Sequence, residues 1–143
     1  MDYVPINIAI NKALLIGGGA TAWQKYQSLK RFNINVTVIS LALNRNFKNE
    51  KINYKKRKYQ KGDLKKYKIA YICLNDEKVK KEIRKEAQKT GTLLNFVDQP
   101  SISDFISPAV YKNRNISIAV SSAGKNVKKS IKIRNKIADS IKL

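Results

Sequence analysis

Short apolar runs alternate with helix-like patterns along the first part of the chain. Residues 12–16 (KALLI) form an apolar run that stops at three glycines, and residues 20–32 then place apolar side chains at helical spacing. Residues 35–40 (NVTVIS) are rich in β-branched side chains, which are typical of strands. The pattern predicts a strand, a tight turn, a helix and a second strand parallel to the first, joined by a right-handed crossover.

The basic segment 50–68 interrupts this alternation and carries interleaved tyrosines. We expect a short edge strand near Lys58 and a turn at Gly62 and Asp63. Two interpretations of the tyrosines and lysines stay open: a solvated edge of the domain, or a surface on which nucleic-acid bases stack.

Helix and strand signals return after this segment. Residues 69–74 predict a buried strand, and Asp76 predicts the N-cap of a helix that ends near Lys89. Residues 94–97 predict a further strand. Apolar residues spaced four apart mark the buried face of the helix: Val79, Ile83 and Ala87.

Together these elements predict an α/β fold, with a Rossmann-like, doubly wound parallel sheet over residues 1–97. Residues 98–143 differ, because 105–111 and 116–120 predict two strands and 125–142 predict a basic amphipathic helix. This second segment is too small for a core of its own. We therefore expect it to pack on the first domain or on a second copy of the chain.

The glycine-rich turn after the first strand carries the strongest chemical signal. Its sequence fits G-x-G-x-x-A between a strand and a helix, a pattern that holds the pyrophosphate of a dinucleotide at the helix N-terminus. The residues concerned are Gly17, Gly18, Gly19, Ala20, Thr21 and Ala22. A glycine turn without a ligand is the alternative interpretation.

The end of the second strand departs from the usual NAD pattern. An acidic residue at this place would bind the ribose hydroxyls. Here the strand ends in Ser40, and the next acidic residue is Glu50. Arg45 lies nearby, which leaves NADP open as the cofactor.

The charge of the chain narrows the class of partner. With 30 Lys and Arg against 10 Asp and Glu, the net charge is +20, which attracts anions. Nucleic acid, an anionic membrane and a polycarboxylate metabolite all meet that description. A coding bias toward lysine would also produce the charge without any function.

The absence of membrane and export signals predicts the compartment. No stretch approaches the roughly 20 apolar residues of a membrane span, and the start MDYVPINIAI lacks the features of a signal peptide. We therefore expect a soluble, cytoplasmic protein. The single cysteine, Cys73, predicts a buried strand residue, and no metal site is expected.

Short motifs follow one another in a distinctive order along nearly the whole chain. They are Tyr3-x-Pro5, the triple glycine with Ala22 and Lys25, Val36 to Val38, Gly62-Asp63-Leu64, Asn75-Asp76, Asn95-Phe96-Val97-Asp98, Phe105, Pro108, and Ser121-Ser122-Ala123-Gly124-Lys125. In this order they resemble the precorrin-2 dehydrogenases. That family includes the N-terminal module of siroheme synthase and bifunctional dehydrogenase/ferrochelatases.

The resemblance implies an NAD-dependent enzyme of siroheme biosynthesis that oxidises precorrin-2 to sirohydrochlorin. It also implies that residues 98–143 form a β-rich dimerisation segment and that the protein is a homodimer. The substrate is an anionic tetrapyrrole, which suits a basic chain, so neither nucleic acid nor a membrane is the expected partner. Iron insertion into the product is left open as a second activity.

The resemblance further implies roles for individual residues. Asp98 matches the catalytic aspartate of the family, as general base or as a group that positions the macrocycle. It follows a predicted parallel strand, where open α/β sheets bind ligands, although a turn before Pro100 also explains it. Further cofactor contacts are expected from Ser40, Asn75 and Asp76, and substrate contacts from Ser121, Ser122, Gly124 and Lys125. Plain helix starts are the alternative for both groups.

Two departures from the family pattern affect these sites. Cys73-Leu74 replaces an Ala-Thr pair before Asn75, and Asn126-Val127 replaces the proline that commonly follows Gly124-Lys125. A further helical region of many relatives is missing, which indicates a minimal or truncated form. A non-catalytic nucleotide-binding module and a basic nucleic-acid-binding module therefore stay as alternatives.

Overall fold

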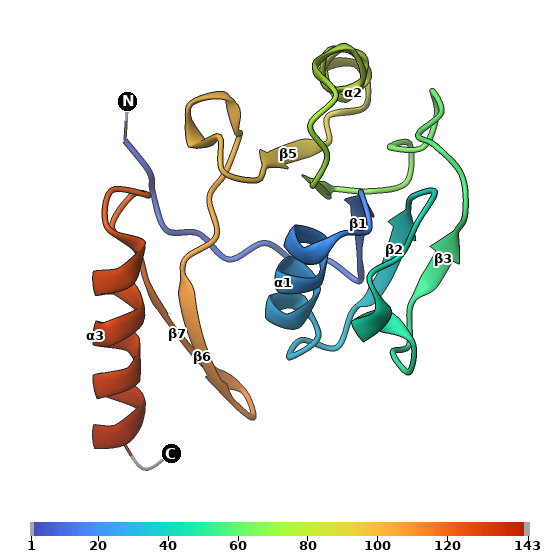
Figure 1. Ribbon diagram of the computed structural model, residues 1–143. Coiled ribbons are helices and arrows are strands. Elements are labelled where there is room, and N and C mark those ends of the chain that lie inside the picture. Colours follow the sequence, from blue (N-terminus) through green and yellow to red (C-terminus); the bar gives the residue numbers. More distant parts are fainter. Residues whose placement is uncertain (1, 142–143) are drawn as a thin grey trace. The chain divides into compact units, whose positions relative to one another are not determined.

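A five-stranded parallel sheet is the centre of the larger part of the chain (Figure 1). The computed structural model describes residues 2–141. All four strand pairings in this sheet are parallel. In spatial order the strands are β3 (Asn53–Lys55), β2 (Asn35–Ile39), β1 (Lys12–Ile16), β4 (Ile69–Ile72) and β5 (Leu93–Phe96). The prediction of a Rossmann-like sheet is confirmed.

Two helices connect neighbouring strands and cover opposite faces of this sheet. The chain passes from β1 to β2 through α1 (Ala20–Leu29) and from β4 to β5 through α2 (Glu77–Thr90), in opposite directions across the sheet. Because both crossovers are right-handed, the helices lie on opposite faces. The buried side of α1 consists of Ala22, Tyr26 and Leu29, and α2 contributes Ile83 and Ala87 to a buried cluster with the strands.

Local sequence sets both ends of α2. The Asp76 carboxylate accepts hydrogen bonds from the backbone N–H groups of Lys78 (3.1 Å) and Val79 (3.2 Å), as expected of an N-cap. Gly91 follows the helix with a left-handed φ of 75°, and its N–H donates to the Ala87 carbonyl (2.8 Å). The helix predicted between Asp76 and about Lys89 is confirmed.

The edge strand expected near Lys58 is wrong in position. The strand lies at Asn53–Lys55, and the residues around Lys58 have no regular structure. Hydrogen bonds to α2 hold this segment instead. Tyr59 donates to one carboxylate oxygen of Glu86, and the Gly62 N–H donates to the other (2.6 Å). Because Glu86 lies far along the chain, local sequence does not reveal these contacts.

The turn predicted at Gly62 and Asp63 is present. The Asp63 carboxylate accepts two hydrogen bonds from the Arg57 guanidinium, at 2.9 and 2.8 Å. Burial opposes ionisation of Asp63, but hydrogen bonds from Arg57 and from the backbone N–H of Gln60 outweigh it and lower the pKa of this carboxyl. The turn is therefore fixed by a charged pair that persists into acid.

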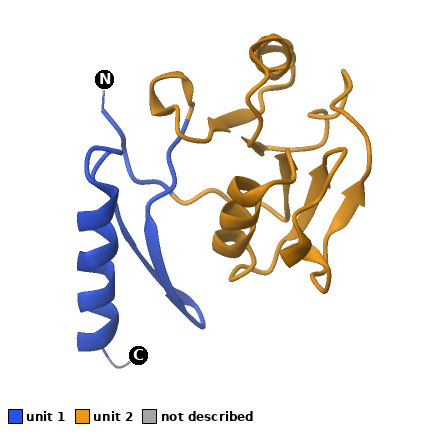
Figure 2. Cartoon of the chain, in the orientation of Figure 1, with its two compact units in different colours: residues 1–6, 105–143 blue, residues 7–104 orange. Residues whose placement is uncertain are grey.

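The chain divides into two compact units, coloured separately in Figure 2. The larger contains residues 7–104, and the smaller contains residues 1–6 and 105–143. In the smaller unit, β6 (Ala109–Asn113) and β7 (Ile116–Val120) form an antiparallel hairpin against which α3 (Val127–Ser140) packs. A short helix, η2 (Pro100–Ile102), follows β5 in the larger unit.

The elements of the smaller unit differ slightly from expectation. The first strand begins at Ala109 rather than at Phe105, directly after Pro108, which has no N–H to donate to a ladder. The expected helix end at Lys142 lies outside the described residues. The functional division at residues 97 and 98 and the dimerisation role stay predictions. No helix within residues 2–141 has the length and apolar character needed to cross a membrane.

Candidate functional site

The carboxyl ends of β1 and β4 lie side by side where the chain changes direction across the sheet. From β1 the chain runs outward to β2 and β3, and it then returns to β4 on the other side of β1. Open α/β sheets bind ligands at such a switch point. Gly17 follows β1 and Cys73 follows β4, so the glycine turn occupies the ligand-binding position of the fold.

Two of the three glycines leave no room for a side chain. A Cβ on Gly17 would lie 2.4 Å from the carbonyl oxygen of Cys73, and the φ of Gly17 is 111°. A Cβ on Gly18 would lie 2.3 Å from the Ala42 carbonyl oxygen and 2.9 Å from Cβ of Ser40. The G-x-G-x-x-A pattern does not restrict its second position, so the sequence did not reveal the constraint on Gly18.

Gly19 has the opposite surroundings. A Cβ there would meet no atom within 4 Å, so the space beside this backbone is open. Gly19 is the N-cap of α1, which has no side-chain cap and no acidic residue in its first turn. The N–H groups of Ala20, Thr21 and Ala22 therefore lack intrahelical acceptors, and helix N-termini of this kind bind phosphate groups.

The carboxyl end of β2 presents a hydroxyl and a cation rather than an acid. Ser40 follows the strand, and Arg45 is exposed at the start of a short helix, η1 (Arg45–Phe47). The backbone N–H of Asn44 donates to the Gly18 carbonyl (2.6 Å), which ties this loop to the glycine turn. The loop therefore borders the site without the acidic residue that is typical of NAD-specific folds.

Asn75 and Asp76 follow β4 at the same edge of the sheet, and both are exposed. One carboxylate oxygen of Asp76 is used to cap α2. The helix-start interpretation of Asp76 is thus correct, while the second carboxylate oxygen is not used by the cap.

Asp98 lies at the carboxyl end of β5, the strand next to β4. The Val97 N–H donates to the Ile72 carbonyl (3.1 Å), which extends the strand pairing to the residue before Asp98. Asp98 then adopts a left-handed backbone with a φ of 65°, which aspartate and asparagine enter more readily than other residues apart from glycine. Its side chain is exposed.

The segment after Asp98 folds back along the outer edge of β5 and fixes the aspartate. The Phe96 N–H donates to the Ser103 hydroxyl oxygen (2.8 Å). The ammonium of Lys80, a buried residue of α2, donates to the side-chain carbonyl of Gln99 (2.9 Å). Asp98 is therefore held between a strand and a loop that is anchored on both sides.

A lysine for which the sequence predicted no role also lies near the carboxyl ends of these strands. The ammonium of Lys25 on α1 lies 5.6 Å from the centre of the Tyr71 ring on β4. Burial lowers the pKa of Lys25, and electrostatic interactions with Cys73 and Asp98 oppose that shift. The signal that could have found Lys25 is a charged residue inside the apolar stripe of a helix.

The thiol of Cys73 is the other titratable group at this place. Burial raises its pKa to about 12, against the smaller opposing effect of the Lys25 charge. The thiol is therefore protonated at neutral pH and is a weak nucleophile. Cys73 directly follows β4 and is half-buried, so the prediction of a buried strand residue is wrong on both points. It is the single cysteine of the chain and has no partner for a disulfide.

The serine turn lies in the smaller unit. The Ser121 and Ser122 hydroxyl oxygens accept hydrogen bonds from backbone N–H groups at 3.2 and 2.9 Å, respectively. Asn126 caps α3, so neither serine is the N-cap. Gly124 has a positive φ of 76°, and Lys125 is exposed. Each hydroxyl keeps a proton that can be donated to a ligand.

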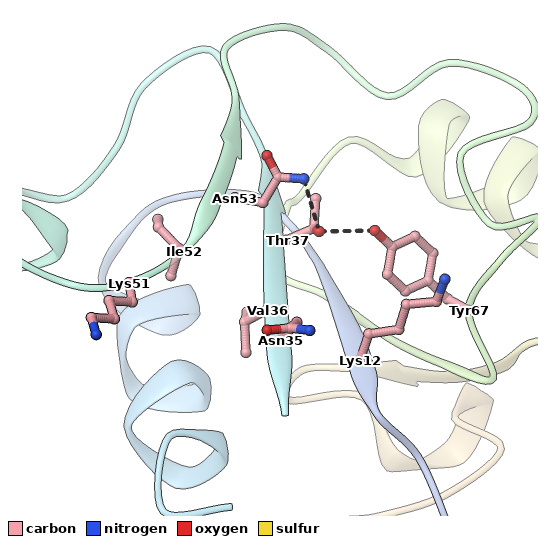
Figure 3. Close-up of a pocket in the computed structure, with 8 residues that line it drawn as sticks. All are labelled: Lys12, Asn35, Val36, Thr37, Lys51, Ile52, Asn53 and Tyr67. Atoms are coloured by element: carbon pink, nitrogen blue, oxygen red, sulfur yellow. Dashed lines mark hydrogen bonds between the residues drawn. The ribbon is translucent and has the colours of Figure 1, made fainter. Parts of the chain in front are cut away.

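A pocket of about 640 Å³ lies at the amino-terminal ends of the strands, away from the glycine turn (Figure 3). Its lining includes the first residues of three strands: Lys12, Asn35 and Asn53. The Thr37 hydroxyl oxygen accepts hydrogen bonds from Tyr67 (2.8 Å) and Asn53 (3.5 Å). The pocket is therefore separate from the strand ends that carry the glycine turn and Asp98.

Comparisons with known proteins agree with this geometry. The family described as "Putative NAD(P)-binding" matches residues 4–109. Siroheme synthase of Nitrosomonas europaea is 30% identical over 131 residues, and that of Blochmanniella pennsylvanica is 31% identical over 129 residues. Each match covers 87% of this chain but only 28% and 27% of the respective relative. The chain thus corresponds to a little over a quarter of these siroheme synthases.

A solved structure shows the same fold. SirC, a precorrin-2 dehydrogenase, superposes with a TM-score of 0.82 at 18% sequence identity, covering 99% of this chain and 71% of the other. Fold and glycine turn together define the class, a Rossmann-like NAD(P)-binding domain. The chain belongs to this NAD(P)-binding family. Its sequence is similar to that of siroheme synthases, and its fold is that of SirC.

Proposed function

We propose that the chain is a precorrin-2 dehydrogenase, which transfers a hydride from precorrin-2 to NAD and releases sirohydrochlorin. The observation that carries the proposal is the open N-terminus of α1 at the switch point, without a side-chain cap, together with Asp98 at the end of a neighbouring strand. Similarity to siroheme synthases and to SirC, a precorrin-2 dehydrogenase, supports the choice of reaction.

The residues of the glycine turn fit a dinucleotide. The open space beside Gly19 and the first-turn N–H groups of α1 suit a pyrophosphate. Ser40, Asn75 and the second carboxylate oxygen of Asp76 are the proposed contacts for the rest of the cofactor. When bound, NAD supplies the hydride acceptor. The exposed Arg45 makes NADP the second cofactor to assay.

Asp98 is the proposed catalytic residue. The oxidation of precorrin-2 removes a proton as well as a hydride. The Asp98 side chain is exposed and makes no hydrogen bond to another residue within 2–141, so its carboxylate is available to accept that proton or to position the macrocycle. A carboxylate at the end of a parallel strand is well placed for either role.

The charge of the chain supports a polycarboxylate substrate. A net charge of +20 concentrates anions near the protein. Ser121, Ser122, Gly124 and Lys125 are the proposed contacts for substrate carboxylates, through hydroxyl, backbone N–H and ammonium donors. A carboxylate would accept the hydroxyl protons while the serine oxygens keep their backbone partners.

A homodimer is part of the proposal. The smaller unit is too small for a large core of its own and exposes several large apolar side chains, which contact with a second copy would bury: Val4, Ile6, Ile116, Val127, Ile131, Ile133 and Ile141. Light scattering on the purified chain is expected to give about twice the monomer mass of 16.3 kDa. Val127→Lys is expected to shift the protein toward monomer. A monomeric wild-type chain would contradict this part of the proposal.

The direct test is NADH formation by the purified chain with precorrin-2 and NAD, followed by absorbance, with NADP in parallel. We expect turnover at a rate that saturates in both substrates, and sirohydrochlorin as the product. Iron insertion is assayed separately by adding Fe(II) to the product. Tight NAD binding without turnover would instead indicate a nucleotide-binding module. Binding to DNA or RNA that falls steeply with salt, without NAD binding, would indicate a nucleic-acid-binding module.

A further inference from the structure

Lys25 lies in an unusual place for a lysine. It belongs to the side of α1 that faces the sheet, among Ala22, Tyr26 and Leu29, and its ammonium lies over the ring of Tyr71. Lys25 is half-buried, and lysine is rarely withdrawn from water without a charged or hydrogen-bonding partner. Burial lowers the pKa of Lys25, which means that the folded protein disfavours the ammonium form in its present surroundings.

The chain does not supply that partner. Within residues 2–141, Lys25 forms no hydrogen bond and no ion pair; its ammonium contacts the Tyr71 ring. Lys80 is a useful comparison, because it is a lysine with a structural role. That residue is buried on α2, and its ammonium reaches Gln99 at 2.9 Å and Glu77 at 3.3 Å. Lys25 has no equivalent of these two contacts.

The oppositely charged group at this place, the Asp98 carboxylate, also has no hydrogen-bonding partner within residues 2–141. Asp98 interacts electrostatically with Lys25, but the two groups do not form an ion pair. They come from α1 and from the end of β5, at the edge of the sheet that carries the glycine turn. A cation and a carboxylate held near each other without contact leave room for a ligand that uses both.

We propose that Lys25 binds a carboxylate of the tetrapyrrole substrate and thereby orients the macrocycle against Asp98. This inference rests on the function proposed above and names a residue of the same site. The pyrophosphate of the cofactor is the other anion nearby. The backbone N–H groups at the start of α1 already supply donors for it, whereas the backbone of Lys25 lies five residues further along the helix, about 7.5 Å along its axis, and its ammonium interacts with Asp98. The substrate carboxylate is therefore the anion that we assign to Lys25.

Replacement of Lys25 by methionine tests the assignment, because methionine keeps the length and apolar character of the side chain and removes the charge. We expect the affinity for precorrin-2, and for uroporphyrin as a polycarboxylate probe that does not react, to fall about 10- to 100-fold. NAD affinity is expected to stay unchanged. Lys25→Arg is expected to retain most of the affinity for both tetrapyrroles.

The matched control is Lys12→Met. Lys12 lies over the Tyr67 ring at 5.2 Å, so this variant removes the same charge and the same kind of ring contact at the opposite edge of the sheet. We expect wild-type affinity for uroporphyrin. A thermal unfolding scan separates binding from structure, because Lys25→Met relieves an unfavourable burial and should unfold at the wild-type temperature or above. If Lys25 served only to stabilise the fold, Lys25→Met would unfold at a lower temperature than the wild type.

The outcomes are distinguishable. Unchanged uroporphyrin affinity in Lys25→Met, with an active wild-type protein, would overturn the role of Lys25 and leave the proposed function standing. A loss of NAD affinity instead would assign Lys25 to the cofactor and would also overturn the inference. A wild-type protein that neither binds uroporphyrin nor forms NADH would remove the proposed function and the inference with it.

Discussion

Replacement of Asp98 by asparagine is expected to lower kcat for NADH formation about 100- to 10,000-fold, the usual loss when a general base is removed. Asparagine matches aspartate in size and tolerates the left-handed backbone at this position, where φ is 65°. The fold and the affinity for NAD should therefore be preserved. Single-turnover kinetics with saturating precorrin-2 and NAD measure the chemical step directly.

Glu82→Gln is the matched control for this variant. Glu82 is exposed on α2, and the substitution removes one negative charge from the same unit of the chain. We expect its turnover to equal that of the wild type. Asp98→Ala should also be inactive, but it adds about 1 kcal/mol of backbone strain, so the asparagine variant gives the cleaner comparison.

The kinetic pattern decides between the two roles of Asp98. A fall in kcat with an unchanged KM for precorrin-2 indicates proton transfer, whereas a raised KM with nearly normal kcat indicates that the carboxylate positions the macrocycle. Turnover of the asparagine variant at the wild-type rate would remove Asp98 from the mechanism.

The second large effect is expected from the glycine turn, where two adjacent positions should fail in different ways. Gly18→Ala places a Cβ against the backbone of Ala42 and should destabilise the fold by about 1–3 kcal/mol. Gly19→Ala meets no protein atom within 4 Å and should fold normally. Its methyl group would occupy the space assigned to the pyrophosphate, so NAD affinity should fall about 10-fold or more.

Thermal unfolding and calorimetric titration with NAD measure the two effects on the same samples. The expected result is a lower melting temperature for Gly18→Ala alone, and weaker NAD binding with a normal melting temperature for Gly19→Ala. Normal NAD affinity in Gly19→Ala would show that the dinucleotide does not rest on this turn, and it would contradict the proposed cofactor site.

Local signals in the sequence determined most of the larger unit. The apolar run before the glycines became β1, and the segment between Asp76 and Gly91 became a capped helix. Apolar periodicity and capping act between residues a few positions apart, so their effect is legible in the sequence. The same local reasoning predicted that the glycine turn and Asp98 follow parallel strands, which the structure bears out.

Contacts between distant segments decided what the sequence left undetermined. The demand for glycine at position 18 comes from the carbonyl of Ala42, and the position of the segment around Lys58 comes from Glu86 on α2. Lys25 gains its significance from Tyr71, on a strand far along the chain. Apolar periodicity and cap residues therefore determined the elements and their order. Only the packing of one segment against another decided which backbone positions admit no side chain and which charge is left without a partner.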